Sequence, residues 1–521
     1  MISKVLQPFA DSGLVFAEAI RALALENGPK TLQLTPGKYV FRKKDAAERY
    51  LPVSNTVRKE DCQIKHIGLL LDGIDDLTID GNGAELVFDG DMSAIVIRNC
   101  RRIRLQNLAV DYIHPRVSEM TAADVREKTA EFIIHPSSRW GEDPDGHFCW
   151  INADGIMESF ESPMVVQNAS PDRHSSLRSA FNPVRNAVSF EKLAAGRVRF
   201  HYPEPPPVKP GEIWQFRDPS RRENGIVIAD SENVTLDGLK LYFTPGLGVV
   251  VQMTRDLTIR NHRHAPAPGS GRVCAAFADC IQVSSCYGNV EIADSFFSGA
   301  QDDPINVHGT YLRVSRIEGR EAILRFGHAE TWGWLPYKTG DEVCFVRRRD
   351  MQRVGSRKVE KAELADPVTV RLTLDRPVDG MDDPEQFVLE NMSSYPDVSI
   401  HGCTFECYPT RGILLSSAGK CRVFGNEIRQ TAARPAVYIA GDANSWYESG
   451  GVRDVKILNN RFRFCPAAAV EINPKIEPGS GIVHRNIEIR ENQYEECSPI
   501  RLRYHSAAEL TTDLPAEAVS K

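Results

Sequence analysis

A short phrase recurs along the chain and constrains its fold more than any other feature. In most copies an Asn or Asp stands directly before alternating Val, Ile or Leu, and another turn residue follows. The copies read DDLTIDGNG, RRIRLQN, ENVTLDG, RDLTIRN, GNVEIAD, PDVSIHG, KCRVFGN, RDVKILNN and RNIEIREN. Period-2 alternation between turn residues predicts strands without intervening helices. Short strands that recur, none able to bury its face alone, predict a stacked coil.

The spacing of the copies predicts one turn of the coil per step. Central apolar residues follow one another by 23, 33, 25, 32 and 32 residues, counted over Val234 to Leu257, Leu257 to Val290, Val398 to Val423, Val423 to Val455, and Val455 to Ile487. Between the copies lie second strands, IVIRN, GVVVQM, GILLSS, AVYIAG and AVEINP. A turn therefore has at least two faces. We predict an all-β protein built on a right-handed parallel β-helix.

Other segments interrupt or precede the repeat. Residues 14–26 form an amphipathic helix that Asp11 and Ser12 could cap, and we expect this helix to cover the open N-terminal end of the coil. Residues 116–219 and 311–387 lack the phrase and are expected to be β-rich, barrel-like insertions that wall a cleft. The expected parts are the cap and first turns (1–115), an insertion (116–219), central turns (220–310), a barrel-like insertion (311–387) and last turns with a tail (388–521).

Composition excludes some classes of function. At 521 residues, with 70 acidic against 63 basic side chains, the chain carries a formal charge of −7 and no basic stripe, so no nucleic-acid partner is expected. No apolar run reaches the length of a membrane span. The 12 cysteines form no CxxC pair, and no secretory signal is evident at the N-terminus. We expect reduced, mostly buried thiols and a cytoplasmic location, or a secreted or periplasmic one if the N-terminus is truncated.

The segment DCIQVSSCYGNVEIADSFFSGAQDDPINVH contains the main candidate site. It holds the pair Asp302 and Asp303, with Asp279 placed 23 residues before Asp302. In a coil with turns of this length, the third carboxylate returns beside the pair. Other Asp-Asp pairs, at Asp75 and at Asp382, stand in ordinary turns, so the triple spacing is the informative feature.

Several carboxyl groups in one patch suit the hydrolysis of a glycosidic bond. A carboxylic acid protonates the leaving oxygen while a carboxylate activates water, and inverting enzymes hold the two groups about 6.5 to 9.5 Å apart. Crowding of like charges raises the pKa of one group so that it keeps its proton near neutrality.

Further residues are candidates for binding a sugar. A turn amide and a histidine follow the pair, a GDANSWYESGG loop offers aromatic faces and polar groups, and later turns add two charged side chains. The candidates are Asn306, His308, Arg411, Asn444, Trp446, Glu448 and Glu471, with Tyr447 as a second aromatic face. His308 could equally be satisfied by backbone, and Asn306 could be a simple turn amide. We expect Trp332 and Trp334 to belong to the core of the second insertion.

The block 278–309 resembles the glycoside hydrolase family 110 α-galactosidases. The resemblance extends to KTLQLTPGKYVF, PVSNTVRK, GIDDLTIDGNGAELVFDG, RGILLSSAGKCRVFGNEI and NSWYESGGVRDVKILNNRF, and covers residues 10–495. It implies a right-handed parallel β-helix with barrel-like insertions and the release of terminal α-1,3-linked galactose with inversion. By the same resemblance Asp279, Asp302 and Asp303 are the catalytic carboxylates. We assign Asp279 as the acid and the pair as the base, although the sequence does not fix that order.

No cofactor or metal ion is expected. The expected partner is an oligosaccharide or glycan with terminal α-galactose, and a homo-oligomer is considered because the sides of solenoids often self-associate. Two other functions stay open. A β-helix polysaccharide lyase would need a cation or a Lys or Arg base, which the Asp-rich block does not favour. A non-catalytic glycan-binding solenoid would use the same Asp residues only as hydrogen-bond acceptors.

Overall fold

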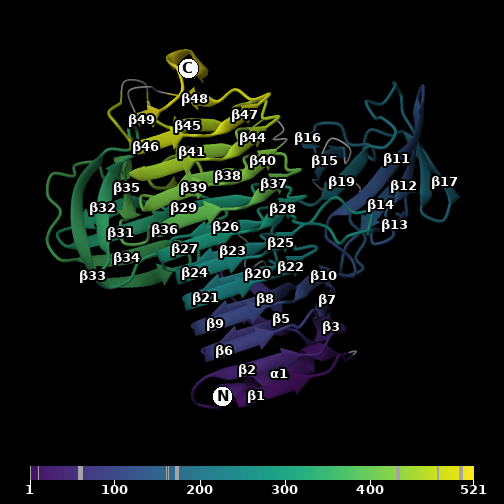
Figure 1. Ribbon diagram of the computed structural model, residues 1–521, viewed down its shortest axis with the longest axis horizontal. Helices are drawn as coiled ribbons and strands as arrows, with labels where there is room; N and C mark the ends of the chain where they lie inside the picture. Colours follow the sequence, from purple (N-terminus) through teal and green to yellow (C-terminus); the bar gives the residue numbers. More distant parts are fainter. Residues whose placement is uncertain are drawn as a thin grey trace.

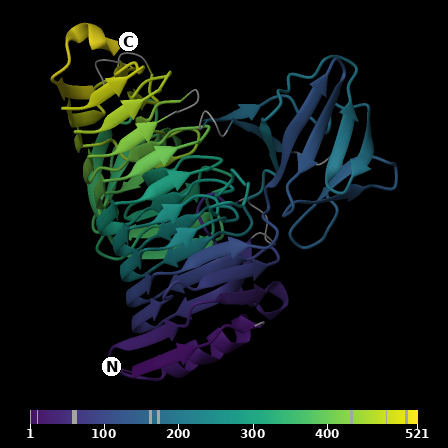
Figure 2. The same ribbon diagram turned by 45° about the vertical axis from the view of Figure 1, so that its right-hand side comes forward.

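The computed structural model describes residues 2–9, 11–56, 63–159, 161, 164–170, 175–429, 434–477, 480–503 and 508–520. Residues 57–59, within PVSNTVRK, lie outside these ranges. The described chain winds into a long parallel β-helix to which two antiparallel modules are attached (Figures 1 and 2). The predicted fold class is therefore confirmed. Among the described residues, no helix is long and apolar enough to cross a membrane.

The first sheet of the β-helix contains all nine copies of the recurring phrase. Its 12 described strands are β1 (Ile2–Leu6), β2 (Lys30–Leu34), β6 (Asp75–Asp80), β9 (Arg101–Gln106), β21 (Glu232–Asp237), β24 (Arg255–Arg260), β27 (Tyr287–Ala293), β36 (Asp397–His401), β39 (Lys420–Phe424), β43 (Asp454–Leu458), β46 (His484–Arg490) and β49 (Ala508–Thr512). Turn residues of the phrase, such as Asn107 and Asn261, adopt positive φ angles of 55° and 51°. Asn tolerates this region because its short side chain can bond locally, which explains its recurrence at the strand ends.

A second sheet was not predicted. Its strands are β3 (Lys38–Arg42), β7 (Glu85–Asp89), β10 (Ala109–Tyr112), β22 (Lys240–Leu241), β25 (Arg263–His264), β28 (Phe296–Ser298), β37 (Thr404–Glu406), β40 (Glu427–Arg429), β44 (Arg461–Arg463) and β47 (Gln493–Glu495). Most of these strands have only two to four residues, too few to show alternation. Each turn of the coil thus has three faces.

The third sheet contains the five apolar strands predicted between the phrases. Its strands are β4 (Ala47–Tyr50), β5 (Ile64–Asp72), β8 (Ser93–Arg98), β20 (Ile226–Ala229), β23 (Val249–Gln252), β26 (Ile281–Ser284), β29 (Ile305–Thr310), β38 (Ile413–Ser416), β41 (Val437–Gly441), β45 (Val470–Pro474), β48 (Ile500–Leu502) and β50 (Val519–Ser520), with β42 (Glu448–Ser449) paired to β29. This sheet carries the candidate site.

Two of the steps counted along the sequence are wrong. Val398 pairs with Cys421, and Cys421 pairs with Val455. The steps are therefore 421 − 398 = 23 and 455 − 421 = 34 residues, in place of the expected 25 and 32. Because side chains on a strand repeat every two residues, a slip of two keeps the same residues on the interior face, which is why the fold was still recognisable.

The interior of the coil is filled by apolar side chains from all three sheets, which form one continuous core. Aromatic rings stack from turn to turn along the second sheet. The ring centroids of Phe41 and Phe88 lie 5.0 Å apart, and those of Phe88 and Tyr112 lie 5.2 Å apart. These distances are close to the ~4.8 Å spacing of neighbouring strands, so each turn places its ring on the one before.

A single α-helix, α1 (Ser12–Ala24), is present in the described chain and lies at the N-terminal end of the coil (Figure 1). Its buried face includes Phe16, Ile20 and Leu23, which confirms the capping role. Its bounds differ from the expected 14–26, and the predicted cap is wrong: Asp11 makes no capping bond and pairs with Arg42 at 3.0 Å. Short 3-10 turns occur at Lys43–Asp45, Pro384–Gln386 and Ala516–Ala518.

The first insertion is a seven-stranded antiparallel sheet with a separate hairpin. The sheet has the order β16 (Ser175–Ser179), β15 (Val165–Ser170), β19 (Ile213–Arg217), β11 (Ser118–Arg126), β12 (Thr129–Ile134), β18 (Arg197–His201) and β17 (Ser189–Ala194), and the hairpin pairs β13 (Arg139–Glu142) with β14 (Phe148–Ile151). The buried Glu119 docks this module on the coil, because its Oε1 accepts bonds from the backbone N–H groups of Val273 and Cys274 at 3.2 and 3.0 Å.

The second insertion is a closed barrel. Around it run β30 (Leu312–Glu318), β31 (Glu321–Phe326), β34 (Thr369–Leu374), β33 (Arg353–Asp366), β32 (Glu342–Arg347) and β35 (Phe387–Asn391). Trp332 and Trp334 are buried in its apolar core, as predicted.

Candidate active site

Three ionisable side chains occupy the same backbone position on three successive turns of the coil. Ile281 on β26 pairs with Ile305 on β29, and Ile305 pairs with Ile413 on β38. Two residues before each of these lie Asp279, Asp303 and Arg411. Their backbones are thus about one strand spacing, ~4.8 Å, apart. The predicted return of Asp279 beside the acidic pair follows from this register.

The loop that carries the pair is fixed before it reaches the strand. Gly299 has a φ of +82°, and a Cβ there would lie 2.2 Å from the carbonyl oxygen of Val273, so only glycine fits. Gln301 is held from the first insertion: its Oε1 accepts a bond from Arg217 Nε at 2.8 Å, and its Nε2 donates to Gln215 Oε1 at 3.1 Å. These contacts set the positions of Asp302 and Asp303.

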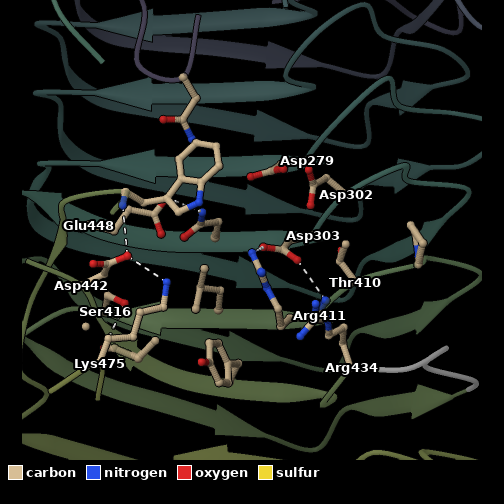
Figure 3. Close-up of a pocket in the computed structure, with 18 of the residues that line it drawn as sticks. Asp279, Asp302, Asp303, Thr410, Arg411, Ser416, Arg434, Asp442, Glu448 and Lys475 are labelled. Atoms are coloured by element: carbon tan, nitrogen blue, oxygen red, sulfur yellow. Dashed lines mark hydrogen bonds and ion pairs between the residues drawn. The ribbon is translucent and has the colours of Figure 1, made fainter. Parts of the chain in front are cut away.

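The three carboxyl groups open into one cavity of about 390 Å³ (Figure 3). The first insertion, the third sheet with its flanking loops, and the N-terminal segment contribute to it. Its lining comprises Asn55, Leu177, Arg178, Arg221, Asp279, Asp302, Asp303, Asn306, Pro409, Thr410, Arg411, Leu414, Ser416, Arg434, Tyr438, Ala440, Gly441, Asp442, Trp446, Glu448 and Lys475.

Asp302 is held by two arginines. Its Oδ2 lies 3.0 Å from Arg221 Nη2 and 3.1 Å from Arg178 Nη2, and Arg178 comes from the first insertion. Burial favours the protonated acid, but these guanidinium groups outweigh it and lower the pKa of Asp302 below its ordinary value. Asp302 is therefore ionised at neutral pH.

Asp279 has the opposite environment. Its side chain is 3% exposed and makes no hydrogen bond or ion pair with the other described residues. Burial, and then the neighbouring charges of Asp302 and Asp303, raise its pKa well above the ordinary range of a carboxyl group. This residue keeps its proton when the other two carboxyl groups do not.

Asp303 lies between these extremes. It accepts a bond from the backbone N–H of Arg411 at 3.0 Å, and Arg411 Nη2 lies 2.5 Å from its Oδ2. Burial raises the pKa of Asp303 to about 6, because the opposing charge of Arg411 is partly offset by Asp302. The site thus contains three carboxyl groups with three different proton affinities.

The opposite wall is a loop from the later turns. Asp442 shapes it by accepting bonds from the backbone N–H groups of residues 444, 445 and 446, and Lys475 Nζ lies 2.8 Å from its Oδ2. Trp446 stacks on His328 of the barrel, with ring centroids 4.0 Å apart. Glu448 follows on β42 and accepts a bond from Asn306 Nδ2 at 3.4 Å. An aromatic face and an acceptor therefore stand across from the carboxyl groups.

The structure brings together most, though not all, of the predicted residues. Those lining the cavity are Asp279, Asp302, Asp303, Asn306, Arg411, Trp446 and Glu448. His308 does not line it: its Nδ1 lies 2.7 Å from the carbonyl oxygen of Gly309 and its Nε2 lies 3.0 Å from Gln282 Nε2. His308 is therefore held by neighbouring backbone and amide groups, and the structure does not place it against the cavity.

Three further predictions are also corrected. Asn444 is exposed outside the cavity and donates to the carbonyl oxygen of Arg348. Tyr447, with a φ of +59°, turns into an apolar cluster under the barrel. Glu471 lies on the next strand beyond Tyr438 and pairs with Arg501 and Arg503 instead of facing the cavity.

Residues that the sequence did not reveal complete the site. Arg178 and Arg221 come from segments without a repeat, so no spacing could place them. Tyr438 has an outward position on AVYIAG, and this polar residue in an apolar strand was the available signal. Asp442 and Lys475 stand on adjacent turns and offer no motif.

A group of residues able to hold a metal ion lies elsewhere. Asp143, Asp145 and His147, in the hairpin loop between β13 and β14, place their ligand atoms within 4.8 Å of one another. They do not line the cavity.

Comparison with known proteins identifies the family. A sequence profile described as GLAA-B beta-barrel domain II matches residues 321–381, within the barrel. α-1,3-Galactosidase A of Bacteroides thetaiotaomicron is 34% identical over 506 residues, which cover 94% of this chain and 87% of that protein. The chain belongs to the α-1,3-galactosidase family, glycoside hydrolase family 110. α-1,3-Galactosidase A of Bacteroides fragilis is also 34% identical, over 90% of this chain and 78% of that protein.

In this α-1,3-galactosidase-family chain, the matched barrel supplies His328 to the stack with Trp446 and Glu330 to an ion pair with Arg221 at 3.7 Å. Among solved structures, a family 28 exopolygalacturonase of Yersinia enterocolitica is similar with a TM-score of 0.39 and 11% identity, over 95% of this chain and 71% of that one.

Proposed function

We propose that the protein is an exo-acting glycoside hydrolase that removes terminal α-linked galactose from oligosaccharides, with inversion at the anomeric carbon. The observation that carries this proposal is the carboxyl triad: Asp279, Asp302 and Asp303 share one cavity while their environments move their pKa values in opposite directions. Divergent proton affinities in one site are what an acid and base pair requires.

Asp279 serves as the general acid in this mechanism. Its proton passes to the glycosidic oxygen as the bond between that oxygen and the anomeric carbon breaks. A water molecule attacks the anomeric carbon from the opposite face and gives its proton to Asp302 or Asp303. The released galactose carries a β-hydroxyl, and the acid and base are reset by exchanging protons with solvent.

The walls of the cavity fit a terminal sugar. Arg178 from the first insertion and the stack of Trp446 on His328 from the barrel enclose it on different sides. The Trp446 face can pack on the apolar face of a pyranose ring, and Asn306 and Glu448 offer hydrogen-bonding groups for hydroxyls. The α-1,3 linkage is proposed from the names of the relatives.

A lyase reaction is less well supported. It would need a Lys or Arg base, and the cavity does contain arginines. However, four of the five basic side chains in the lining have acidic partners. Arg178 and Arg221 are paired with Asp302, Arg411 with Asp303, and Lys475 with Asp442. Their positive charges stabilise ionised carboxylates, a role that conflicts with acting as a base.

The test is a screen of nitrophenyl glycosides together with α-1,3-, α-1,4- and α-1,6-linked galactosyl oligosaccharides. Free galactose should appear from α-galactosides, with preference for the α-1,3 linkage, and a chelator should leave the rate unchanged. If no α-galactoside released galactose, the proposal would be wrong. Unsaturated products from uronate polymers would support the lyase instead.

A further inference from the structure

A second cavity, of about 570 Å³, lies where the first insertion meets the coil. We call it the junction cavity; its lining is Asp91, Arg116, Asn152, Ala153, Asp154, Ile156, Met157, Glu158, Ser159, Asp218, Pro219, Ser220 and Arg222. It shares none of its lining residues with the active-site cavity. The two cavities are nevertheless adjacent along the chain, because Arg221 bonds Asp302 and the next residue, Arg222, lines the junction cavity.

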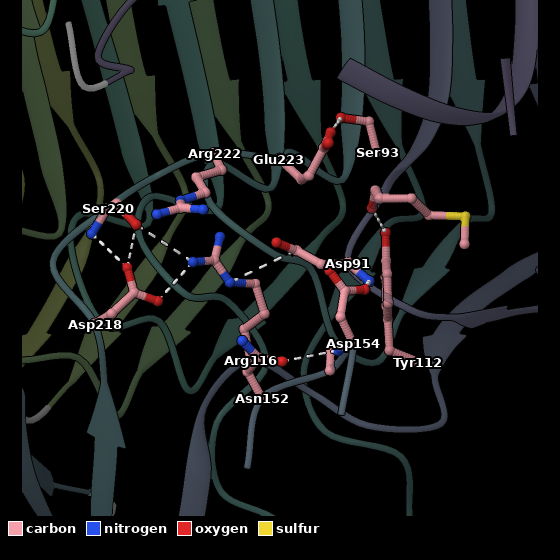
Figure 4. A network of polar contacts seen from close by, with 12 residues as sticks. Asp91, Ser93, Tyr112, Arg116, Asn152, Asp154, Asp218, Ser220, Arg222 and Glu223 are labelled. Atoms are coloured by element: carbon pink, nitrogen blue, oxygen red, sulfur yellow. Dashed lines mark hydrogen bonds and ion pairs between the residues drawn. The ribbon is translucent and has the colours of Figure 1, made fainter. Parts of the chain in front are cut away.

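A buried arginine with spare hydrogen-bonding capacity forms the base of the junction cavity (Figure 4). The Arg116 side chain is 7% exposed, and its Nη2 lies 2.5 Å from Asp218 Oδ2. Its Nε is 3.6 Å from Asp91 Oδ1, and Asp91 Oδ1 accepts no hydrogen bond from the described residues. Arg116 Nη1 likewise has no partner among them. Both atoms are sealed from solvent, so they make the wall beneath the cavity polar without themselves facing a ligand.

A carboxyl group without a partner completes the polar lining. Glu158 is half-buried, and its side chain makes no hydrogen bond or ion pair with the other described residues. Burial, and then the charge of Asp218, raise the pKa of Glu158 to about 7. Near neutrality this group can therefore either donate or accept a hydrogen bond. The Ser220 backbone N–H donates to Asp218 Oδ1, so this carboxylate already accepts a hydrogen bond within the protein.

Apolar side chains stand beside these groups. Ile156 is 63% exposed and Met157 is 41% exposed, although both line the junction cavity. An apolar patch next to paired donors and acceptors matches a pyranose, which has a C–H face and a rim of hydroxyl groups that both donate and accept. The lining contains four carboxyl groups against two guanidinium groups, so an anionic ligand is disfavoured.

We propose that the junction cavity is a second carbohydrate-binding site, separate from the active site, that takes an uncharged sugar residue. Arg222 donates to its hydroxyls, Glu158 accepts from them, and Met157 packs on its C–H face. This site does not depend on the hydrolytic reaction.

The experiment is an isothermal titration of the whole protein with galactose and with N-acetyllactosamine at millimolar concentration. The wild type should bind one of these sugars at two sites per chain. Glu158→Ala should weaken the second site by about tenfold or more, since a hydrogen-bond acceptor is lost, and Met157→Ser should weaken it less. Glu127→Ala, a change at an exposed glutamate of the same insertion, should alter neither site.

Inhibition of nitrophenyl α-galactoside hydrolysis by galactose reports the active site alone. Its inhibition constant should be the same in the wild type and in Glu158→Ala. If Glu158→Ala weakened no binding site for either sugar, the proposal would be overturned. If the wild type hydrolysed no galactoside, the proposed function would fail while the titration still decided the second site.

Discussion

The turns that carry the active site and the turns on either side of them share one backbone. At the position before the strands of the third sheet, three successive turns hold Asp279, Asp303 and Arg411. The flanking turns hold, at the same position, Asn224, Leu247, Pro435 and Ala468. The backbone hydrogen bonds between turns are alike. The Gly225 N–H donates to the carbonyl oxygen of Leu247 at 2.8 Å, and the Cys280 N–H donates to the carbonyl oxygen of Asp303 at 3.1 Å. The coil therefore supplies a uniform scaffold, and function resides in the side chains of three turns and in the two walls beside them.

The largest expected effect is the loss of kcat when an acidic residue of the active turns is replaced, compared with an acidic residue elsewhere in the chain. Asp279→Asn removes the proton donor, and kcat should fall by about 10²- to 10⁴-fold. Asp302→Asn should give a loss of similar size, with sugar binding largely retained in a titration. The matched control is Asp382→Asn, in an exposed Asp-Asp pair, which should leave kcat within roughly twofold of wild type. Equal losses in the control would show that the spacing of the triad carries no information.

The arginines of the site come next, because they give the neighbouring carboxylates Asp302 and Asp303 different ion-pair partners. Arg411→Met leaves Asp303 buried without its partner, and kcat should fall by about 10²-fold through misplacement of the base. The free energy of unfolding should fall by about 2–3 kcal/mol, less than the ~3–5 kcal/mol of a fully buried pair, because Arg411 is 30% exposed. Thermal unfolding and steady-state kinetics measure the two effects. An unchanged melting temperature would contradict this account of Asp303.

The pH dependence of kcat distinguishes the two candidates for the base. The rate should rise as the base loses its proton and fall at higher pH as Asp279 loses its own, because the pKa of Asp279 is raised by burial and by its acidic neighbours. If Asp303 is the base, the acid limb lies at about pH 6. If Asp302 is the base, the limb lies below the ordinary carboxyl range, because its arginines lower the pKa. A rate that rose monotonically with pH would contradict the role of Asp279 as acid.

The smallest effect on activity is expected at the wall of the cavity opposite the three carboxyl groups, where Trp446 lies. Trp446→Ala removes the aromatic face, whose packing contributes about 0.5–1.5 kcal/mol, so KM should rise by up to about tenfold while kcat changes little. His328→Ala should act in the same direction and more weakly, since it only supports the Trp446 ring. A fall in kcat with unchanged KM would place Trp446 in the chemistry rather than in binding.

Much of the fold could be predicted because each repeat contains a strand in which apolar and polar side chains alternate. The phrases and the apolar strands between them mark two sheets, and a two-residue error in register did not change which face is buried. The second sheet could not be predicted because strands such as Lys240–Leu241 are too short to show an alternating pattern. The predicted cap of α1 is wrong because the Asp11 side chain pairs with Arg42 and makes no hydrogen bond to the helix end.

The site was predictable only where the repeat sets it. Asp279 returns beside Asp303 because one turn separates them, and Arg411 follows one turn later. Arg178 and Arg221 could not be found, since they belong to segments whose position depends on docking of the first insertion. Glu471 was misassigned for a related reason: it shares a column with Asn306 but lies three turns away, where it pairs with Arg501.

Proton NMR of the sugar released at the earliest times tests the central claim most directly. A water molecule activated by Asp302 or Asp303, opposite an acid at Asp279, gives β-galactose first from an α-linked substrate, and the α anomer appears later by mutarotation. First-formed α-galactose would show retention, and would contradict the assignment of these three carboxyl groups as the acid and base of a single displacement.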